Sequence, residues 1–551
     1  MALRTLLSAL LALAALTVGA HGRAAAQEPF DILITDARVV DGTGAPWYRA
    51  DIGIRGGRIA EIGTLDGRSA RRTIAAEDRV VAPGFIDLMN QSTALFVADR
   101  VTAESRLRQG ITTAVSGEGW SHAPQNERTQ RNPATFGGQP VRWRTFAEYF
   151  ALLERHGLAL NVVHNVGAAQ VRRVVLGDED VDPTPEQLQQ MRRLVEQAME
   201  DGAIGISTSL IYPPGNYADT DELVALSEIA ARHGGIYLTH MRNESNRLLE
   251  SIDEALEIGR RAGIPVHIYH LKAAGRDNWP LMERAIAKIE DARRTGMDVT
   301  ADIYPYIRNG IGLGAFLAPR HYARGAEAFL RTLSDPAVRA RLRREVETGT
   351  DYENWYRHVG SDWGKVLITG AGSYPGKVAG LSVAEAAARE GKSAWDMFFD
   401  LVQAGGVSVA PESMNEEQKH MALRAPFVML ETDTEPVNPA TAESTHPRAM
   451  GAFPRVIAKY VMEDSVLTME QAIQRMTSLP ANRLGLHDRG RIAPGMAADL
   501  IVFDPARLRD KATFENPLQY AEGVDYLLVN GQLAIDDGRM TDALGGAVLR
   551  R

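Results

Sequence analysis

The sequence predicts an α/β protein: a (β/α)8 TIM-like barrel joined to a small β-sandwich domain that both ends of the chain build. The middle of the chain alternates short apolar strands with amphipathic helices, which is typical of a parallel sheet with crossover helices. Both ends contain short strands separated by glycine-rich turns. The 551 residues suffice for a barrel and an accessory module.

The first 26 residues have the pattern of a signal peptide. Arg4 supplies a positive charge, residues 6–18 form an apolar stretch too short to span a bilayer, and an alanine run precedes Gln27. A buried N-terminal helix, the alternative, does not explain this order of features. We therefore expect a periplasmic or secreted protein. The chain has no cysteine, so it offers neither a disulfide nor a thiolate ligand.

The composition limits the class of partner. The formal net charge is -9, and the basic residues are not gathered into one run, which argues against nucleic acid. The proportions of hydrophobic and charged residues, 45% and 24%, are ordinary for a soluble globular protein without a stable membrane span. We expect a small molecule as the partner, and the sequence does not indicate the oligomeric state.

Residues 27–82 and 486–551 are expected to form one composite β-sandwich domain, since chain termini often lie close together. The strand-like segments are 31–34, 38–40, 51–54, 498–503 and 526–531, with turns at 41–44 and 56–57. Residues 83–485 are then left for the barrel.

Eight strand candidates account for a closed barrel: 81–90, 111–118, 160–167, 203–211, 236–241, 266–271, 297–306 and 427–434. Amphipathic segments such as 222–233 and 246–262 are predicted as the helices between them. The stretch before the last strand is longer than one crossover helix needs. It contains an arginine-rich helical run at 337–347 and an extra strand at 366–370. We expect an insertion at about 310–425 that covers the active site.

Polar side chains follow several predicted strands, where barrels of this kind place their reacting groups. Glu118, His240 and His270 lie at the C-terminal ends of the second, fifth and sixth strands, and Asp433 lies at the end of the last. Imidazole and carboxylate are zinc ligands, so this pattern indicates a metal site. The alternative stays open at this point: histidines at strand ends are often structural, and acidic residues often cap turns.

Several motifs resemble those of amidohydrolases. Residues 83–87, 239–242 and 269–272 look like the first, fifth and sixth barrel strands of that superfamily. The two histidines are 30 positions apart, a spacing that suits one crossover helix. More specific motifs, similar to those of the N-acyl-D-amino-acid deacylase (D-aminoacylase) family, lie at 207–215, 304–306, 446–448, 451–455, 489–495 and 529–531. The resemblance covers nearly the whole mature chain and implies a metal-dependent amide hydrolase.

Two positions depart from the family pattern. The first-strand histidine pair of the family would fall at Met89 and Gln91, so the metal site that such a pair builds is expected to be absent or crippled. The family also commonly has a cysteine after the second strand, which aligns nearer to Gly119. We expect the adjacent Glu118 to replace that thiolate, and the alternative is that Glu118 caps a turn.

The resemblance implies one Zn2+ ion, other divalent metals being possible, held by Glu118, His240 and His270 with one position open to water. Metal-bound water would attack the amide, while Asp433 acts as general base and then general acid. An N-acyl (D-)amino acid would yield a carboxylic acid and a free amino acid.

Substrate contacts are predicted for Arg448, Tyr304, Tyr306, Lys272 and Gln91. The resemblance assigns Arg448 to the substrate carboxylate, which a guanidinium can bind through two hydrogen bonds. An ion pair between Arg448 and an acid such as Glu443 is the alternative, and packing is the alternative for the Tyr-Pro-Tyr segment.

Two other functions stay open. One is a dipeptidase or cyclic-amide hydrolase on the same barrel, and the former would require a free amino group. The other is a degenerate barrel that binds ligands without turnover, which the missing histidine pair favours. The set of Glu118, His240, His270 and Asp433 favours an active enzyme. No Gly-x-Ser-x-Gly elbow indicates a serine hydrolase.

Overall fold

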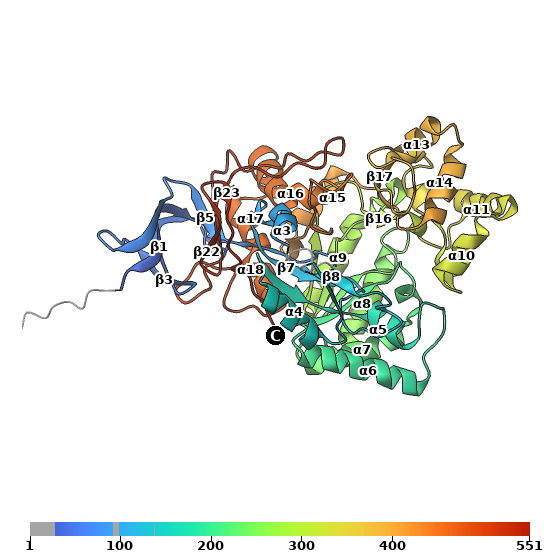
Figure 1. Ribbon diagram of the computed structural model, residues 1–551, viewed down its shortest axis with the longest axis horizontal. Coiled ribbons are helices and arrows are strands. Elements are labelled where there is room, and N and C mark those ends of the chain that lie inside the picture. Colours follow the sequence, from blue (N-terminus) through green and yellow to red (C-terminus); the bar gives the residue numbers. More distant parts are fainter. Residues whose placement is uncertain (1–27, 92–98, 137) are drawn as a thin grey trace, which may run out of the picture.

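The computed structural model describes residues 28–91, 99–136 and 138–551. The predicted signal peptide lies outside these residues. The chain has three parts: a sheet made by its two ends, a central barrel, and an inserted unit on the side of the barrel away from that sheet (Figure 1). Among the described residues, no helix combines the length and apolar character needed to cross a membrane.

Both ends of the chain contribute to one nine-stranded sheet, ordered β23-β22-β21-β20-β5-β1-β2-β3, with β4 also paired to β1. Its strands are β1 (Phe30–Val39), β2 (Tyr48–Arg55), β3 (Arg58–Gly63), β4 (Ala70–Ala75), β5 (Val80–Pro83), β20 (Leu500–Phe503), β21 (Val524–Val529), β22 (Gln532–Asp536) and β23 (Arg539–Met540). Strand β20 joins the two ends because it pairs antiparallel with β5. Isoleucines at alternate positions of β1 and β2 pack with Leu500 and Val502.

The barrel strands run in chain order around the barrel. They are β6 (Phe85–Asp87), β7 (Ile111–Ser116), β10 (Asn161–His164) continued by β11 (Val166–Gly167), β12 (Gly205–Ser209), β13 (Ile236–His240), β14 (Val266–Ile268), β15 (Val299–Ile303) and β19 (Val428–Leu430). Neighbouring strands pair parallel. The barrel closes between its last and first strands, since the backbone N–H of Asp433 donates to the carbonyl of Met89 at 3.0 Å.

The first predicted strand, 81–90, is divided in the structure. Its beginning, β5, belongs to the terminal sheet, and only β6 belongs to the barrel. The division falls at Gly84, whose backbone N–H donates to the carbonyl of Asp499. A Cβ at Gly84 would lie 2.3 Å from the side chain of Thr112, so only glycine permits this close crossing.

Helices cover the outside of the barrel. They are α3 (Arg100–Leu107), α4 (Phe146–His156), α5 (Ala168–Val175), α6 (Pro185–Glu200), α7 (Thr220–Arg232), α8 (Leu248–Ala262), α9 (Leu281–Arg294), α15 (Glu416–Arg424), α16 (Arg448–Arg455), α17 (Met469–Met476) and α18 (Ser478–Leu484). Helix α8 shows why they form: Leu248, Ile252, Ala255 and Ile258 share one buried face at helical spacing. Gly263 ends this helix with φ +64°.

The inserted unit has its own small sheet and apolar core. Its elements are β16 (Ile311–Gly312), α10 (Ala326–Thr332), α11 (Pro336–Thr348), α12 (Trp355–His358), β17 (Val366–Gly370), α13 (Val383–Arg389), α14 (Ala394–Ala404) and β18 (Ser408–Pro411). Trp363 stacks on Phe398 within that core. The expected end of the insertion near 425 is too late, because α15 packs on α9, β15 and β19 and buries Leu423 in the barrel core.

Candidate metal centre and substrate cavity

A cavity of about 680 Å³ opens at the C-terminal ends of the barrel strands. Barrel residues that line it include Gln91, Glu118, Ser209, Tyr212, His240, Glu244, His270, Lys272, Tyr304, Asp433, Glu435, His446 and Arg448. The loop 309–312 and residues 369, 370, 406 and 408 of the inserted unit form another part of its wall. The inserted unit therefore supplies part of the wall of this cavity, at the edge of the barrel where reacting groups lie.

Glu118, His240 and His270 form a cluster of potential metal ligands in this cavity. One ligand atom from each lies within 4.8 Å of the other two, and all three side chains are buried. Oε1 of Glu118 lies 2.8 Å from Nδ1 of His240 and 3.0 Å from Nε2 of His270. The structure thus brings together the three side chains that the sequence assigned to a metal.

Local backbone geometry makes this convergence possible. Gly119 adopts φ +70°, and a Cβ there would lie 2.6 Å from the backbone nitrogen of Ser209, so Glu118 reaches the fifth and sixth strand ends only with glycine after it. His270, Asp433 and Gln91 also have positive φ, at 37°, 50° and 51°. Non-glycine residues rarely adopt this conformation, and such strain concentrates at functional sites.

The charges around the ligand cluster favour an ionised carboxylate. Burial acts to raise the pKa of Glu118, but hydrogen bonds from His240 and His270 outweigh it and lower this pKa to about 2. Burial and the nearby Lys272 act to lower the pKa of His270, whereas Glu244, Asp433 and Glu118 raise it to about 10. A cation would therefore replace a proton at His270, so metal binding is expected to release protons.

Glu244 is a site residue that the sequence analysis missed. Its Oε1 lies 2.8 Å from Nδ1 of His270, and its Oε2 accepts from Nζ of Lys272 at 2.5 Å. A carboxylate in this position fixes the orientation and tautomer of an imidazole ligand. An acid four residues after His240, in the same strand-end loop, was the available signal.

Asp433 is held by two donors. Its Oδ1 accepts from Nε2 of Gln91 at 2.9 Å, and its Oδ2 accepts from Nη1 of Arg448 at 2.5 Å. Burial raises the pKa of Asp433, and Arg448 opposes that rise. A raised pKa brings a carboxylate closer to the working range of a general base.

Arg448 lies at the wall of the cavity, although its ion-pair partner is Asp433 and not the predicted alternative, Glu443. Its guanidinium stacks 4.6 Å from the ring centre of Tyr304. Nη2 of Arg448 lies close to the backbone of Gly310, where an added Cβ would be only 2.3 Å from this nitrogen. Nε is buried without a hydrogen-bond partner, which leaves a donor for a bound carboxylate.

The role predicted for Tyr306 is not supported by the structure. Tyr304 lines the cavity, but Tyr306 does not. The chain turns at Pro305, and the ring of Tyr306 packs against His446 and Phe514, with the guanidinium of Arg455 4.9 Å from its centre. The packing alternative for this residue is therefore the better interpretation.

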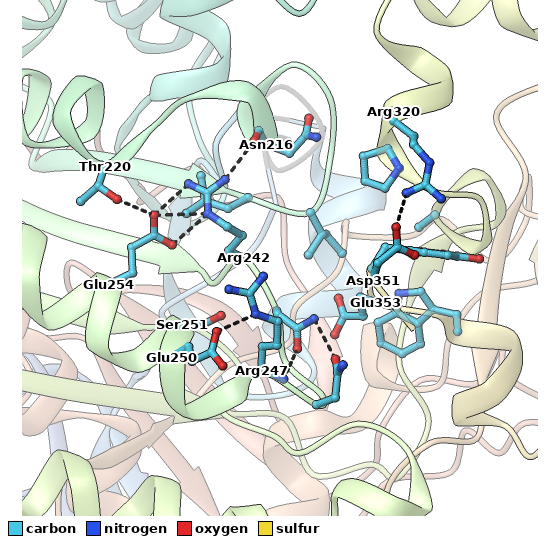
Figure 2. A pocket seen from close by; sticks show the side chains of 18 residues that line it. Asn216, Thr220, Arg242, Arg247, Glu250, Ser251, Glu254, Arg320, Asp351 and Glu353 are labelled. Atoms are coloured by element: carbon cyan, nitrogen blue, oxygen red, sulfur yellow. Dashed lines mark hydrogen bonds and ion pairs between the residues drawn. The ribbon is translucent and has the colours of Figure 1, made fainter. Parts of the chain in front are cut away.

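A second cavity, of about 480 Å³, lies beside the first, between the loop after β13 and the inserted unit (Figure 2). Its arginines pair with its own acids: Arg242 with Glu254, Arg247 with Glu250, and Arg320 with Asp351. Glu353 also lines it and accepts from the backbone N–H of Glu244 at 2.9 Å. The inserted unit is thus bonded directly to the loop that orients His270.

Lys419 of α15 is buried beneath the cavity, with Nζ 4.6 Å from the ring centre of Tyr304. Burial, and secondarily the charge of Lys272, lower its pKa from 10.5 to about 7. Between these two pKa values Lys419 is protonated in the unfolded chain and neutral in the folded one. The free energy of unfolding therefore rises with pH across this range, and the destabilisation caused by burying Lys419 is complete below pH 7.

We expect Lys419→Met to raise the free energy of unfolding at pH 7. The variant should also lack the increase of stability with pH that the lysine causes. Each pH unit within the window corresponds to about 1.4 kcal/mol in wild type. Denaturant unfolding at pH 7 and pH 9 measures the difference between the two proteins. Equal slopes of stability against pH would contradict the lowered pKa.

Comparisons with known proteins identify the family. Residues 72–535 match the Amidohydrolase family. The chain is 33% identical over 527 residues to the D-aminoacylase of Alcaligenes xylosoxydans xylosoxydans, covering 95% of this chain and 98% of that protein. It is 35% identical over 508 residues to the N-acyl-D-glutamate deacylase of the same organism, covering 92% and 93%.

Solved structures agree with these relatives. The N-acyl-D-glutamate deacylase from Bordetella bronchiseptica, complexed with zinc and a phosphonate inhibitor, matches with a TM-score of 0.78 at 32% identity, over 95% of this chain and 100% of that chain. A D-aminoacylase structure concerned with a binuclear metal center matches equally well, with a TM-score of 0.78 at 32% identity and the same coverage. The barrel with an added β-domain is confirmed, and the chain belongs to the amidohydrolase family, in its N-acyl-D-amino-acid deacylase (D-aminoacylase) branch.

Proposed function

We propose that this protein hydrolyses the amide bond of N-acyl-D-amino acids and releases a carboxylic acid and a free amino acid. One observation carries the proposal: Glu118, His240 and His270 converge in the same cavity as Asp433. Metal ligands beside a separate carboxylate are what water-dependent amide cleavage requires. The names of the relatives, a D-aminoacylase and an N-acyl-D-glutamate deacylase, support the substrate class.

A single zinc ion is part of the proposal. Two imidazoles and a carboxylate suit Zn2+ and leave a fourth position open. The first strand adds no imidazole, because Met89 packs with Leu238 and Tyr269, and Gln91 donates to Asp433. A second ion would lack these ligands, which favours one ion over the binuclear arrangement. A bound divalent ion supplies a more acidic water and a polarised amide carbonyl.

The protein groups have distinct roles in this proposal. Asp433 takes the proton of the attacking water and returns it to the leaving nitrogen. Arg448, Lys272 and Tyr304 line the same cavity and bind the substrate carboxylate, which places the amide beside the ligand cluster. The inserted unit limits access of bulk water to these groups.

A hydrolysis screen tests the function. Zinc-loaded protein would be incubated with paired N-acetyl-D- and N-acetyl-L-amino acids, with dipeptides and with cyclic amides, and released amine or opened ring would be measured. We expect release from the D-series and much slower release from the L-series. Release of no amine from any N-acyl amino acid would overturn the proposal, and exclusive cleavage of dipeptides or cyclic amides would replace it.

Arg448→Lys is expected to weaken substrate binding, because an ammonium cannot reproduce the paired hydrogen bonds of a guanidinium. We expect kcat/KM for an N-acyl-D-amino acid to fall about tenfold or more, a loss typical of a charged hydrogen bond. The corresponding amino-acid amide, which lacks the carboxylate, serves as the control substrate. Equal wild-type activity on the acid and its amide would contradict the assignment.

We also propose that the mature chain begins at Gln27 and acts in the periplasm or outside the cell. The charge, apolar stretch and alanine run of residues 1–26 support this location. N-terminal sequencing of protein from a periplasmic extract would test it. A cytoplasmic protein that retains Met1 would contradict it.

A further inference from the structure

Glu435 is an acid that the proposed mechanism does not use. It follows the last barrel strand by a few residues, lines the substrate cavity and remains exposed to solvent there. Within the described part of the chain Glu435 makes no ion pair. Partial desolvation raises the pKa of Glu435 and the charge of Arg106 opposes this rise, but the two side chains are too far apart to form an ion pair. The other described acids of the cavity wall differ: Glu244 is paired with Lys272, Asp433 with Arg448, and Glu118 with His240 and His270.

The loop that carries Glu435 is anchored on both sides. Arg106 is fully buried, and its Nη2 donates to the carbonyl of Thr434 at 2.6 Å. Oγ of Ser105 accepts from the backbone N–H of Val437 at 3.1 Å. Arg106 also donates to Asn90 and Ala449, so the donors of its guanidinium are used in these bonds. The carboxylate of Glu435 is therefore carried by a fixed backbone and forms no ion pair with Arg106.

Among the described residues, the part of the cavity wall that the inserted unit supplies carries no charged side chain. The inserted unit and the loop leading into it contribute Asn309, Gly310, Ile311, Gly312, Thr369, Gly370, Gly406 and Ser408. A second carboxylate on the substrate would meet this neutral wall and Glu435, because Lys272 and Arg448, the lysine and arginine among the described residues that line the cavity, are assigned to the first carboxylate. A positively charged group on the substrate would instead meet an unpaired carboxylate.

We propose that Glu435 selects substrates that carry an ammonium or guanidinium group in addition to the carboxylate and the scissile amide. This inference rests on the proposed function and narrows its substrate class. The cation belongs either to the side chain of the amino acid, as in an N-acyl-D-lysine, or to the acyl group, as in an aminoacyl-D-amino acid. N-acyl-D-glutamate, the substrate named for one relative, is expected to be a poor substrate here.

Matched substrates test the proposal. N-acetyl-D-lysine and N-acetyl-D-norleucine differ by the terminal ammonium, and glycyl-D-norleucine places an ammonium on the acyl side. We expect wild type to prefer at least one cationic substrate over N-acetyl-D-norleucine by about tenfold in kcat/KM, a factor typical of a charged hydrogen bond. The preference should shrink at high ionic strength, because salt screens an accessible ion pair.

Glu435→Gln should reduce this preference to about onefold to threefold while activity on N-acetyl-D-norleucine is retained. Glu443→Gln, which changes an exposed acid of the same loop that does not line the cavity, should leave the preference intact. An unchanged preference in Glu435→Gln would overturn the proposal. Wild-type preference for N-acetyl-D-glutamate or for N-acetyl-D-norleucine over both cationic substrates would overturn it as well.

A binding measurement separates this inference from the proposed function. Calorimetry is run on zinc-loaded protein that carries Asp433→Asn to suppress turnover, with N-acetyl-D-lysine, glycyl-D-norleucine and N-acetyl-D-norleucine as ligands. Tighter binding of a cationic ligand to this protein than to the same protein with Glu435→Gln supports the role of Glu435 even if wild type hydrolyses no N-acyl amino acid. Equal binding of all three ligands before Glu435 is changed counts against Glu435, whatever the hydrolysis screen shows.

Discussion

Asp433→Asn is expected to lower the turnover of N-acyl-D-amino acids by a factor on the order of a hundred or more, while the fold and the bound metal are retained. Asparagine keeps the size of the side chain and an oxygen that accepts from Gln91, but it has no basic carboxylate. Burial raises the pKa of Asp433 in the wild type, which suits a group that must take up a proton and then return it.

Metal content must be measured on both proteins, because a variant without metal would be inactive for another reason. Glu443→Gln provides a matched control in the same loop, outside the cavity wall, and should keep wild-type activity. If Asp433→Asn hydrolyses amides at the wild-type rate with metal bound, another residue is the base. Glu118 would be the first candidate, and its assignment as a ligand would be withdrawn. A wild type that binds acylated ligands but releases no amine would be a binding protein.

Glu118→Gln is expected to weaken metal binding by a factor on the order of a hundred or more and to remove activity in proportion. The carboxylate supplies the negative charge at the cluster, and its low pKa, about 2, keeps it ionised throughout the neutral range. Elemental analysis after dialysis should give one tightly held ion per wild-type chain and almost none in the variant.

Glu244→Gln is the control for this experiment. Glu244 contacts His270 but lies outside the three-residue ligand cluster, so its loss should cost less, about tenfold to a hundredfold in affinity. Full retention of metal by Glu118→Gln would contradict the ligand assignment. Two tightly bound ions per wild-type chain would contradict the single-ion proposal and indicate that Met89 and Gln91 do not prevent a second site.

The barrel and its ligand cluster were predictable because both follow from regular features of the chain. Apolar runs, helical spacing and turn residues marked eight strands and the helices between them. The C-terminal ends of parallel strands meet at one edge of the barrel. The position of Glu118, His240, His270 and Asp433 at the ends of predicted strands was therefore enough to place them near one another.

The first strand was harder to assign, because its apolar run continues through a change of sheet. Residues 81–90 are predicted as one strand, yet β5 and β6 pair with different neighbours on either side of Gly84. The reason is a steric contact with Thr112, which is distant in sequence. Nothing local to the run distinguishes a glycine at a crossing from a glycine within a strand.

The sequence by itself thus determined the barrel, the composition of the ligand cluster and the loss of the first-strand histidines. Only the tertiary structure decided that Arg448 pairs with Asp433, that Tyr306 points away from the cavity, and that Glu244 supports His270. Periodic elements repeat in sequence and can be recognised there. The paths of loops depend on contacts between distant residues, such as the bond from Arg106 to the backbone before Glu435, and those contacts exist only in the folded chain.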